Sequence, residues 1–194
     1  MARTFTAMVL MVCAGLTACG SRPKLALQSI SGVMPDLQFQ LTDDDGRPVT
    51  AQSYRGDVVL LYFGYTHCPD VCPTTLASLS QAIKGLAAEA SKVRVLFVTV
   101  DPQRDTAELL KRYAGYFGPQ FVGLRGDDSQ LRALTRRYDA SFQIDAPDRS
   151  GNYSVQHSSA VYIFDSKGKA RLVTDATDQN GLITHDLRAL IAGA

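Results

Sequence analysis

The sequence predicts an α/β domain in which a central mixed sheet is flanked by helices on both faces. A continuous apolar run at 58–63 and a largely apolar segment at 93–100 have the β-branched and aromatic composition of buried strands. Amphipathic stretches with helical spacing follow them, and a strand–turn–strand pattern lies near the C-terminus. Strands that alternate with helices in this way form sheets covered on both faces.

The first half of the chain supplies the core strands. Residues 37–41 alternate apolar and polar side chains and run into a DDDG turn at 43–46, which predicts a strand followed by a turn. The apolar run 58–63 predicts a central strand. A helix is expected within 74–90, where leucines and an isoleucine recur at helical spacing, and 93–100 is the next buried strand.

The second half continues the alternation. It predicts a helix at 105–117, a short strand at 121–124 and a second helix at 129–140. A polar loop or small hairpin is expected at 142–153, a strand hairpin at 160–173 and a closing helix at 184–191. This order of elements is that of a thioredoxin-like fold.

The composition is that of an ordinary globular protein. Of 194 residues, 45% are hydrophobic and 20% are charged, so a normal buried core is available. The 20 basic and 19 acidic side chains leave a net charge of +1 without a basic stripe. Nucleic-acid binding therefore has no electrostatic support.

The N-terminus predicts export and membrane attachment. A basic start, an apolar run and small residues before Cys19 indicate a lipoprotein signal peptide over 1–18, with Cys19 as the lipidated residue. An ordinary cleaved signal is the alternative, and an uncleaved anchor is disfavoured because the run is shorter than the roughly 20 residues of a spanning helix. We expect residues 19–34 to form a tether and 35–194 the folded domain.

Only one pair of cysteines remains for that domain. Cys13 lies in the apolar run of the signal and Cys19 is the expected lipid site, which leaves Cys68 and Cys72. A disulfide that closes so small a loop removes little entropy from the unfolded chain, so it would stabilise the fold only slightly. The pair is therefore predicted to be chemical rather than structural.

These cysteines lie between a predicted strand and a predicted helix. Unpaired backbone N–H groups and the helix dipole favour anions there, which predicts a lowered pKa for both thiols. The Cys-x-x-x-Cys spacing puts the two Cβ atoms roughly 5–6 Å apart on one face of a turn. Two thiolates so placed can bind a soft ion such as Cu(I), or can form a disulfide. The spacing leaves both chemistries open.

Three separated segments resemble the Sco/SenC copper-chaperone family. They are GYTHCPDVCPTTL at 64–76, VTVDPQRDT at 98–106 and QHSS at 156–159. The likeness extends from about residue 33 to the C-terminus, and it implies a thioredoxin-like domain that binds copper. By this resemblance Cys68, Cys72 and His157 are the copper ligands, and Asp101 lies near the metal site and supports it.

The resemblance also implies a function and partners. It implies an extracytoplasmic metallochaperone, rather than an enzyme, that delivers copper to the dinuclear centre of cytochrome c oxidase subunit II. Other periplasmic copper chaperones or thiol reductants are further expected partners. The expected location is a bacterial membrane, with the domain in the periplasm or outside the cell. Where thioredoxins place a cis-proline, this chain offers the imidazole of His157, which favours metal binding over disulfide exchange.

Two other activities stay open at this stage. Cys68 and Cys72 can serve as the redox pair of a thiol–disulfide oxidoreductase that reduces the acceptor's cysteines. A peroxidase fits less well, because it needs a lone low-pKa cysteine. His67 is not expected as a ligand, since neighbouring residues of an extended segment point to opposite sides. His185 is predicted to be a surface residue of the closing helix.

Overall fold

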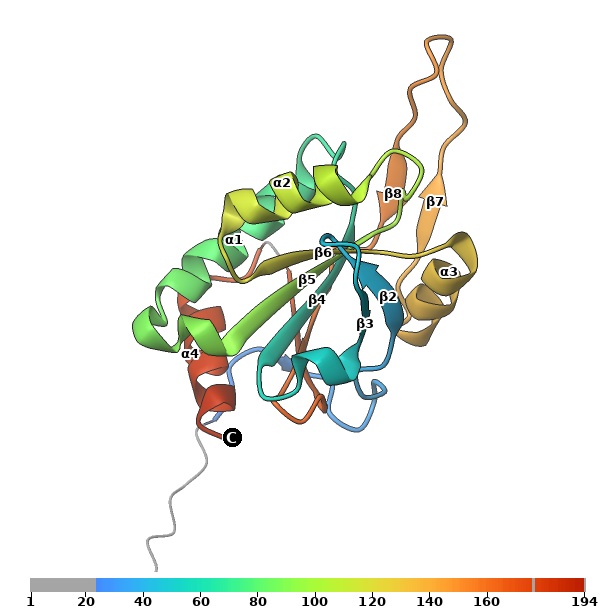
Figure 1. Cartoon of the computed structure of the whole chain (residues 1–194). Coiled ribbons are helices and arrows are strands. Elements are labelled where there is room, and N and C mark those ends of the chain that lie inside the picture. Colours follow the sequence, from blue (N-terminus) through green and yellow to red (C-terminus); the bar gives the residue numbers. More distant parts are fainter. Residues whose placement is uncertain (1–23, 176, 194) are drawn as a thin grey trace, which may run out of the picture.

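The computed structural model, which describes residues 24–175 and 177–193, has the predicted α/β architecture (Figure 1). The strands are β1 (Gln28–Ser29), β2 (Gln40–Asp43), β3 (Pro48–Thr50), β4 (Val58–Gly64), β5 (Val93–Thr99), β6 (Phe121–Arg125), β7 (Phe142–Ile144), β8 (Val155–His157), β9 (Val161–Phe164) and β10 (Ala170–Thr174). The helices are η1 (Ala51–Tyr54), α1 (Val71–Lys84), η2 (Ala87–Lys92), α2 (Ala107–Phe117), α3 (Asp128–Arg137) and α4 (Asn180–Ile191).

Eight of the strands form one mixed sheet, in the order β1-β10-β9-β4-β5-β6-β2-β3. Strands β4, β5 and β6 are parallel, whereas β9 pairs with β4 in the antiparallel sense. The parallel strands β4 and β5 are buried along almost their whole length, which explains their largely apolar sequences. Strands β7 and β8 form a separate hairpin that projects from the domain (Figure 1).

Aromatic side chains fill the space on both faces of this sheet. Tyr62 and its cross-strand neighbour Phe97 share one face, where Phe97 packs against Tyr113 of α2 at 5.4 Å between ring centroids. Leu61, the residue before Tyr62, points to the opposite face. There its cross-strand neighbour Tyr162 packs against Tyr138 after α3, at 5.7 Å between centroids. The two faces are therefore covered by different helices, as the alternating sequence predicts.

Two element boundaries differ from the sequence prediction in ways that matter for the site. The helix expected within 74–90 begins earlier, so α1 starts at Val71 and its first turn includes Cys72. It ends at Lys84 because Gly85 closes it, and a separate 3₁₀ segment follows. The polar region predicted as a loop or small hairpin forms the β7–β8 hairpin, and His157 is its last paired residue.

The predicted tether of residues 19–34 is wrong over its second half. Strand β1 pairs with β10, and Leu27 is buried in the core. The carboxylate of Asp186 in α4 accepts the backbone N–H groups of Ala26 and Leu27, at 2.9 and 2.7 Å. Asp186 lies some 160 positions along the chain from these two residues, so no local sequence pattern could predict the contacts. The folded domain begins near residue 25 rather than at 35.

The expected signal peptide at 1–18 and the lipidation site Cys19 lie outside the described residues. Within the described part of the chain, no helix has both the length and the apolar character needed to cross a bilayer.

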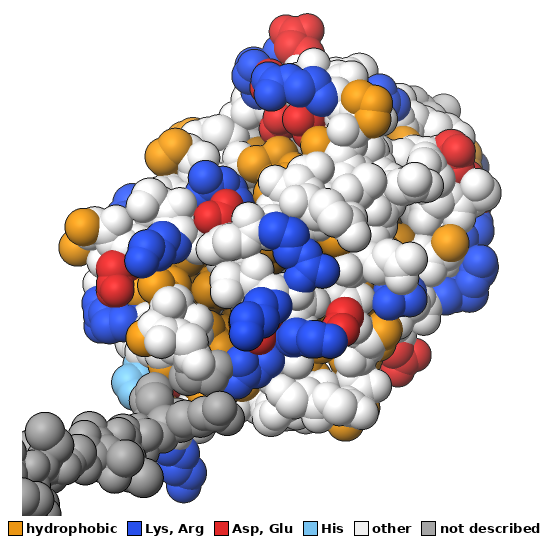
Figure 2. Space-filling model, turned by 60° about the horizontal axis from the view of Figure 1, so that its bottom comes forward, with side chains coloured by type: hydrophobic (Ala, Val, Ile, Leu, Met, Phe, Trp, Pro, Cys, Tyr) orange, Lys and Arg blue, Asp and Glu red, His pale blue; other side chains and the backbone are white. Residues whose placement is uncertain are grey.

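Charged side chains are mixed on the surface. Figure 2 shows basic side chains spread over one face of the domain, with acidic side chains among them. Exposed ion pairs elsewhere on the surface, such as Arg112–Glu108 in α2 at 2.6 Å, each contribute about 0–1 kcal/mol. The stability of the fold therefore comes mainly from its apolar core.

Candidate metal centre

The structure brings together the three residues that the family resemblance implies as copper ligands. Cys68 lies in the loop after β4, Cys72 in the first turn of α1, and His157 at the end of β8. The two sulfurs and one imidazole nitrogen all lie within 4.8 Å of one another. Both thiols are free. A sulfur–sulfur–nitrogen cluster of this size suits a soft, low-coordinate ion such as Cu(I).

Hydrogen bonds fix the tautomer of His157. Its Nδ1 lies 2.9 Å from the backbone carbonyl oxygen of Ser158, which can only accept, so Nδ1 carries a proton. Burial lowers the pKa of the imidazole, which favours the neutral ring. Nε2 is then a bare lone pair, 3.2 Å from Sγ of Cys72, and accepts the thiol proton. A backbone carbonyl that orients the distal nitrogen is the usual arrangement behind a metal-binding histidine.

Burial, and not the helix dipole, controls Cys72. Its side chain is fully buried, and this burial raises the pKa of the thiol from 9.0 to about 12. The prediction of a lowered pKa was therefore wrong for this cysteine. The helix N-terminus acts instead on its partner, because the backbone N–H of Cys72 points at Sγ of Cys68 at 3.4 Å. Metal-free Cys72 is therefore a thiol, and a metal cation that binds its sulfur displaces the proton.

Aromatic rings and a glycine shape the wall around these ligands. The rings of Tyr62 and Tyr65 contact the ring of His157 edge-on, at 6.1 and 5.8 Å between centroids. A Cβ on Gly64 would come within 2.8 Å of Sγ of Cys72, so only glycine leaves room for the sulfur there. The tyrosines serve as packing residues, and they restrict the orientation of the imidazole.

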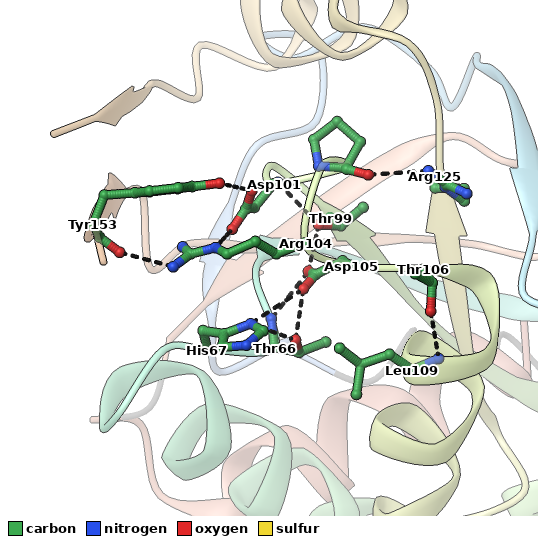
Figure 3. Close-up of polar contacts among 11 residues, drawn as sticks. Thr66, His67, Thr99, Asp101, Arg104, Asp105, Thr106, Leu109, Arg125 and Tyr153 are labelled. Atoms are coloured by element: carbon green, nitrogen blue, oxygen red, sulfur yellow. Dashed lines mark hydrogen bonds and ion pairs between the residues drawn. The ribbon is translucent and has the colours of Figure 1, made fainter. Parts of the chain in front are cut away.

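Asp101 supports the site indirectly. Its carboxylate accepts the hydroxyl of Tyr153 at 2.7 Å and pairs with Arg104 (Figure 3). Arg104 also donates to the backbone carbonyl of Tyr153 at 3.0 Å and stacks on its ring. None of the hydrogen bonds or ion pairs among the described residues joins Asp101 to Cys68, Cys72 or His157. Through Tyr153 it holds the segment that leads into β8, the strand that ends at the histidine.

Asp105 is a second buried carboxylate that the sequence reading missed. It accepts the backbone N–H of Thr66 at 3.0 Å, the hydroxyl of Thr66 at 2.5 Å and the hydroxyl of Thr99 at 2.6 Å. Thr66 lies just before the Cys68 loop, so Asp105 fixes the path of the chain into the site (Figure 3). The only sequence signal was a second aspartate four residues after Asp101, which also reads as the start of a helix.

The other two histidines lie outside the cluster. His67 has a half-exposed side chain and contacts Thr66, whereas His185 lies in α4 beside the buried Asp186. Neither imidazole is part of the Cys68, Cys72 and His157 cluster.

Sequence and structure comparisons relate the chain to one family. The SCO1/SenC family profile matches residues 5–192. The chain is 35% identical to an SCO2-like protein of Rickettsia felis over 132 residues, which are 68% of this chain and 64% of that protein. It is 41% identical to a mitochondrial SCO2 homologue of Bos taurus over 132 residues, 67% of this chain and 50% of that protein. The match thus spans half to two thirds of these relatives' lengths.

Two solved structures with copper bound have the same fold. Bradyrhizobium japonicum ScoI is 35% identical with a TM-score of 0.72, and the match covers 79% of this chain and 97% of that one. Yeast Sco1 is 26% identical with a TM-score of 0.75, and the match covers 83% of this chain and 90% of that one.

Proposed function

The chain belongs to the SCO1/SenC family, and from that premise we propose that it is an extracytoplasmic copper metallochaperone. Its acceptor would be the dinuclear copper centre of cytochrome c oxidase subunit II. The observation that carries the proposal is the cluster of Cys68, Cys72 and His157, whose donor atoms lie within 4.8 Å. Similar proteins bind copper in their solved structures.

The donor set suits copper as cargo. Two thiolates and one neutral imidazole supply a trigonal set of soft donors, which is the coordination that Cu(I) prefers. Binding removes the proton that Cys72 shares with Nε2 of His157, and the Ser158 carbonyl keeps that nitrogen directed at the site. Transfer would then proceed by exchange of ligands between donor and acceptor, with no bond made or broken in a substrate.

Subunit II as acceptor is supported by the family and by the expected location. Sco proteins are described as a family of cytochrome c oxidase assembly proteins. A lipid on Cys19 would place the domain beside a membrane-bound oxidase and raise its effective concentration there.

A thiol–disulfide oxidoreductase is the second candidate. The observation in its favour is that both thiols are free and their sulfurs lie within 4.8 Å of each other, so a side-chain rotation would suffice to bring them to the roughly 2 Å of a disulfide bond. Against it, Cys72 has a raised pKa and shares its proton with His157, whereas a resolving thiol is most reactive as a thiolate. A Cys68–Cys72 disulfide would remove two copper ligands, so copper loading would require the reduced pair.

The decisive experiment is a Cu(I) titration of the reduced chain from Ser21 onward, which retains every described element. A competing chelator sets the free Cu(I) concentration, and the His157→Ala and His185→Ala variants are measured in parallel. A copper chaperone binds one tight equivalent, which His157→Ala weakens at least about tenfold and His185→Ala leaves unchanged. Weak binding that is indifferent to His157 would instead favour the redox catalyst.

The acceptor is tested separately, by mixing the copper-loaded chain with the metal-free soluble domain of subunit II. Appearance of the dinuclear copper absorption in the acceptor is expected. If copper stays on this chain while a free Cu(I) salt fills the acceptor, subunit II is the wrong partner.

A further inference from the structure

One buried hydroxyl beside the copper ligands has no hydrogen-bond partner. The Tyr62 side chain is fully buried in β4, and its hydroxyl makes no hydrogen bond to any group of the described residues. A buried polar group that is left unpaired costs free energy, and native proteins keep few of them. Such a hydroxyl at a metal centre therefore points to a partner that it gains in another state of the site.

This hydroxyl belongs to the face of the sheet that holds the Cys72 sulfur. Tyr62 and Gly64 are two residues apart in β4, so both point to the same face. A Cβ on Gly64 would come within 2.8 Å of Sγ of Cys72, which places the sulfur over this face of the strand. The ring of Tyr62 also contacts the ring of His157 edge-on, at 6.1 Å between centroids. Tyr62 therefore lies beside two of the three copper ligands.

The hydroxyl of Tyr62 faces two groups that can only accept its proton. The side chains of Cys72 and Thr75, both near the start of α1, lie within its hydrogen-bonding reach. Thr75 donates its own proton to the carbonyl of Val71 at 2.8 Å. The thiol of Cys72 shares its proton with Nε2 of His157. Burial raises the pKa of Tyr62, so its phenol keeps the proton and is the donor in either contact.

The Cys72 sulfur becomes a stronger acceptor once copper has displaced its proton. Burial raises the pKa of this thiol, whereas the backbone N–H of Tyr65 and the hydroxyl of Tyr62 act in the opposite direction, because both hydrogen-bond the thiolate. Hydrogen bonds to a charged acceptor are roughly twice as strong as those between neutral groups. The unpaired donor therefore gains most when Cys72 is a metal-bound thiolate.

We propose that Tyr62 is a positioning residue, whose hydroxyl donates a hydrogen bond to the Cys72 thiolate in the copper-bound protein and thereby favours Cu(I) over Cu(II). The inference rests on the proposed function and adds a determinant of oxidation state to it. Two thiolates and a neutral imidazole around Cu(I) carry one net negative charge, whereas the same set around Cu(II) is neutral. A hydrogen-bond donor stabilises the charged complex more. Hydrogen bonds to a cysteine sulfur tune the potential of copper sites in this way.

Tyr62→Phe tests the proposal, because it removes the hydroxyl and keeps the buried ring. It is compared with the wild type in the same reduced chain as the Cu(I) titration, under anaerobic conditions. Cu(I) affinity, measured by chelator competition, should fall about tenfold, and Cu(II) affinity by a smaller factor. The reduction potential of the bound copper should therefore fall, by up to about 59 mV for a tenfold change in the ratio of the two affinities.

Tyr113→Phe is the matched control. The hydroxyl of Tyr113 is also buried without a partner among the described residues, and its ring packs on Phe97 on the same face of the sheet. Its interactions with Cys68 and Cys72 are electrostatic and include no hydrogen bond. This variant should leave both copper affinities and the potential unchanged.

Two further measurements distinguish a hydrogen bond to the thiolate from a packing role. In Cu(II)-loaded Tyr62→Phe, the sulfur-to-copper charge-transfer absorption should move to longer wavelength, because a sulfur without the hydrogen bond is a better electron donor. The metal-free variant should unfold at a thermal midpoint no lower than that of the wild type, since the hydroxyl has no partner among the described residues of the metal-free protein.

The outcomes separate the role of Tyr62 from the function of the protein. Tight wild-type binding with an unchanged affinity ratio and absorption in Tyr62→Phe refutes the hydrogen bond and leaves the chaperone function standing. Equal shifts in Tyr113→Phe, or a lower midpoint of metal-free Tyr62→Phe, also refute it, since the effect would then be one of packing. Weak Cu(I) binding by the wild type refutes the proposed function and the role of Tyr62 together.

Discussion

Copper affinity should rise with pH, because metal-free Cys72 keeps its proton. Burial raises the pKa of this thiol to about 12, so the group is protonated throughout the neutral range. Copper binds the thiolate, and each copper therefore releases one proton from Cys72. The lowered pKa of His157 leaves that ring neutral above about pH 7, so it releases none.

The magnitude follows from the proton count. The proton that Cys72 releases contributes by itself about a tenfold rise in affinity for each pH unit, or about 1.4 kcal/mol, and any proton that Cys68 releases adds to it. The assay is a Cu(I) competition between about pH 7 and pH 9, with a chelator whose own pH dependence is known. Cys72→Ser should bind more weakly, and its slope of log affinity against pH should be lower by one. His157→Ala should bind more weakly with an unchanged slope.

Equal slopes for the wild type and Cys72→Ser would refute this reasoning. They would mean that Cys72 is already a thiolate in the apo-protein, which is the state that the helix N-terminus alone would favour.

Three further predictions concern the support of the site and of the fold. Gly64→Ala should lower both copper affinity and stability, the latter by about 1–3 kcal/mol in chemical unfolding, because the new methyl group would come within 2.6 Å of the Phe97 ring and 2.8 Å of the Cys72 sulfur. An unchanged affinity would show that the sulfur moves freely. Asp186→Ala should cost about 3 kcal/mol and expose the chain near residue 27 to proteases, since two backbone amides lose a buried charged acceptor. Cleavage as slow as in the wild type would contradict the anchoring role. Tyr113→Phe should raise the free energy of unfolding by about 1 kcal/mol, because the buried hydroxyl has no hydrogen-bond partner among the described residues. A loss of stability, measured from the denaturant midpoint, would mean that the hydroxyl is satisfied.

The sequence predicted well those features that local pattern determines. Strands β4 and β5 read as apolar runs because both of their faces are covered, and the structure buries them almost completely. The site was predictable for a related reason. Two cysteines four residues apart at a strand–helix junction must lie close together, and the family resemblance supplied the distant third residue, His157.

Long-range polar contacts carry no such pattern. The anchoring of Ala26 and Leu27 by Asp186 joins the two ends of the domain, and the segment reads locally as a tether. Asp105 likewise reads as the start of a helix, although its carboxylate fixes Thr66, 39 residues away. Such contacts depend on the completed fold, so a single sequence gives no sign of them.

The error about Cys72 shows which force dominates at the site. A helix N-terminus stabilises an adjacent anion by up to about 2 kcal/mol. A rise of the thiol pKa from 9.0 to about 12 corresponds to about 4 kcal/mol in the opposite direction. Desolvation of a fully buried sulfur therefore outweighs the dipole. A buried thiol that keeps its proton is a poor nucleophile but becomes a good ligand once a cation replaces that proton. The same burial therefore favours metal carriage over disulfide exchange at Cys72.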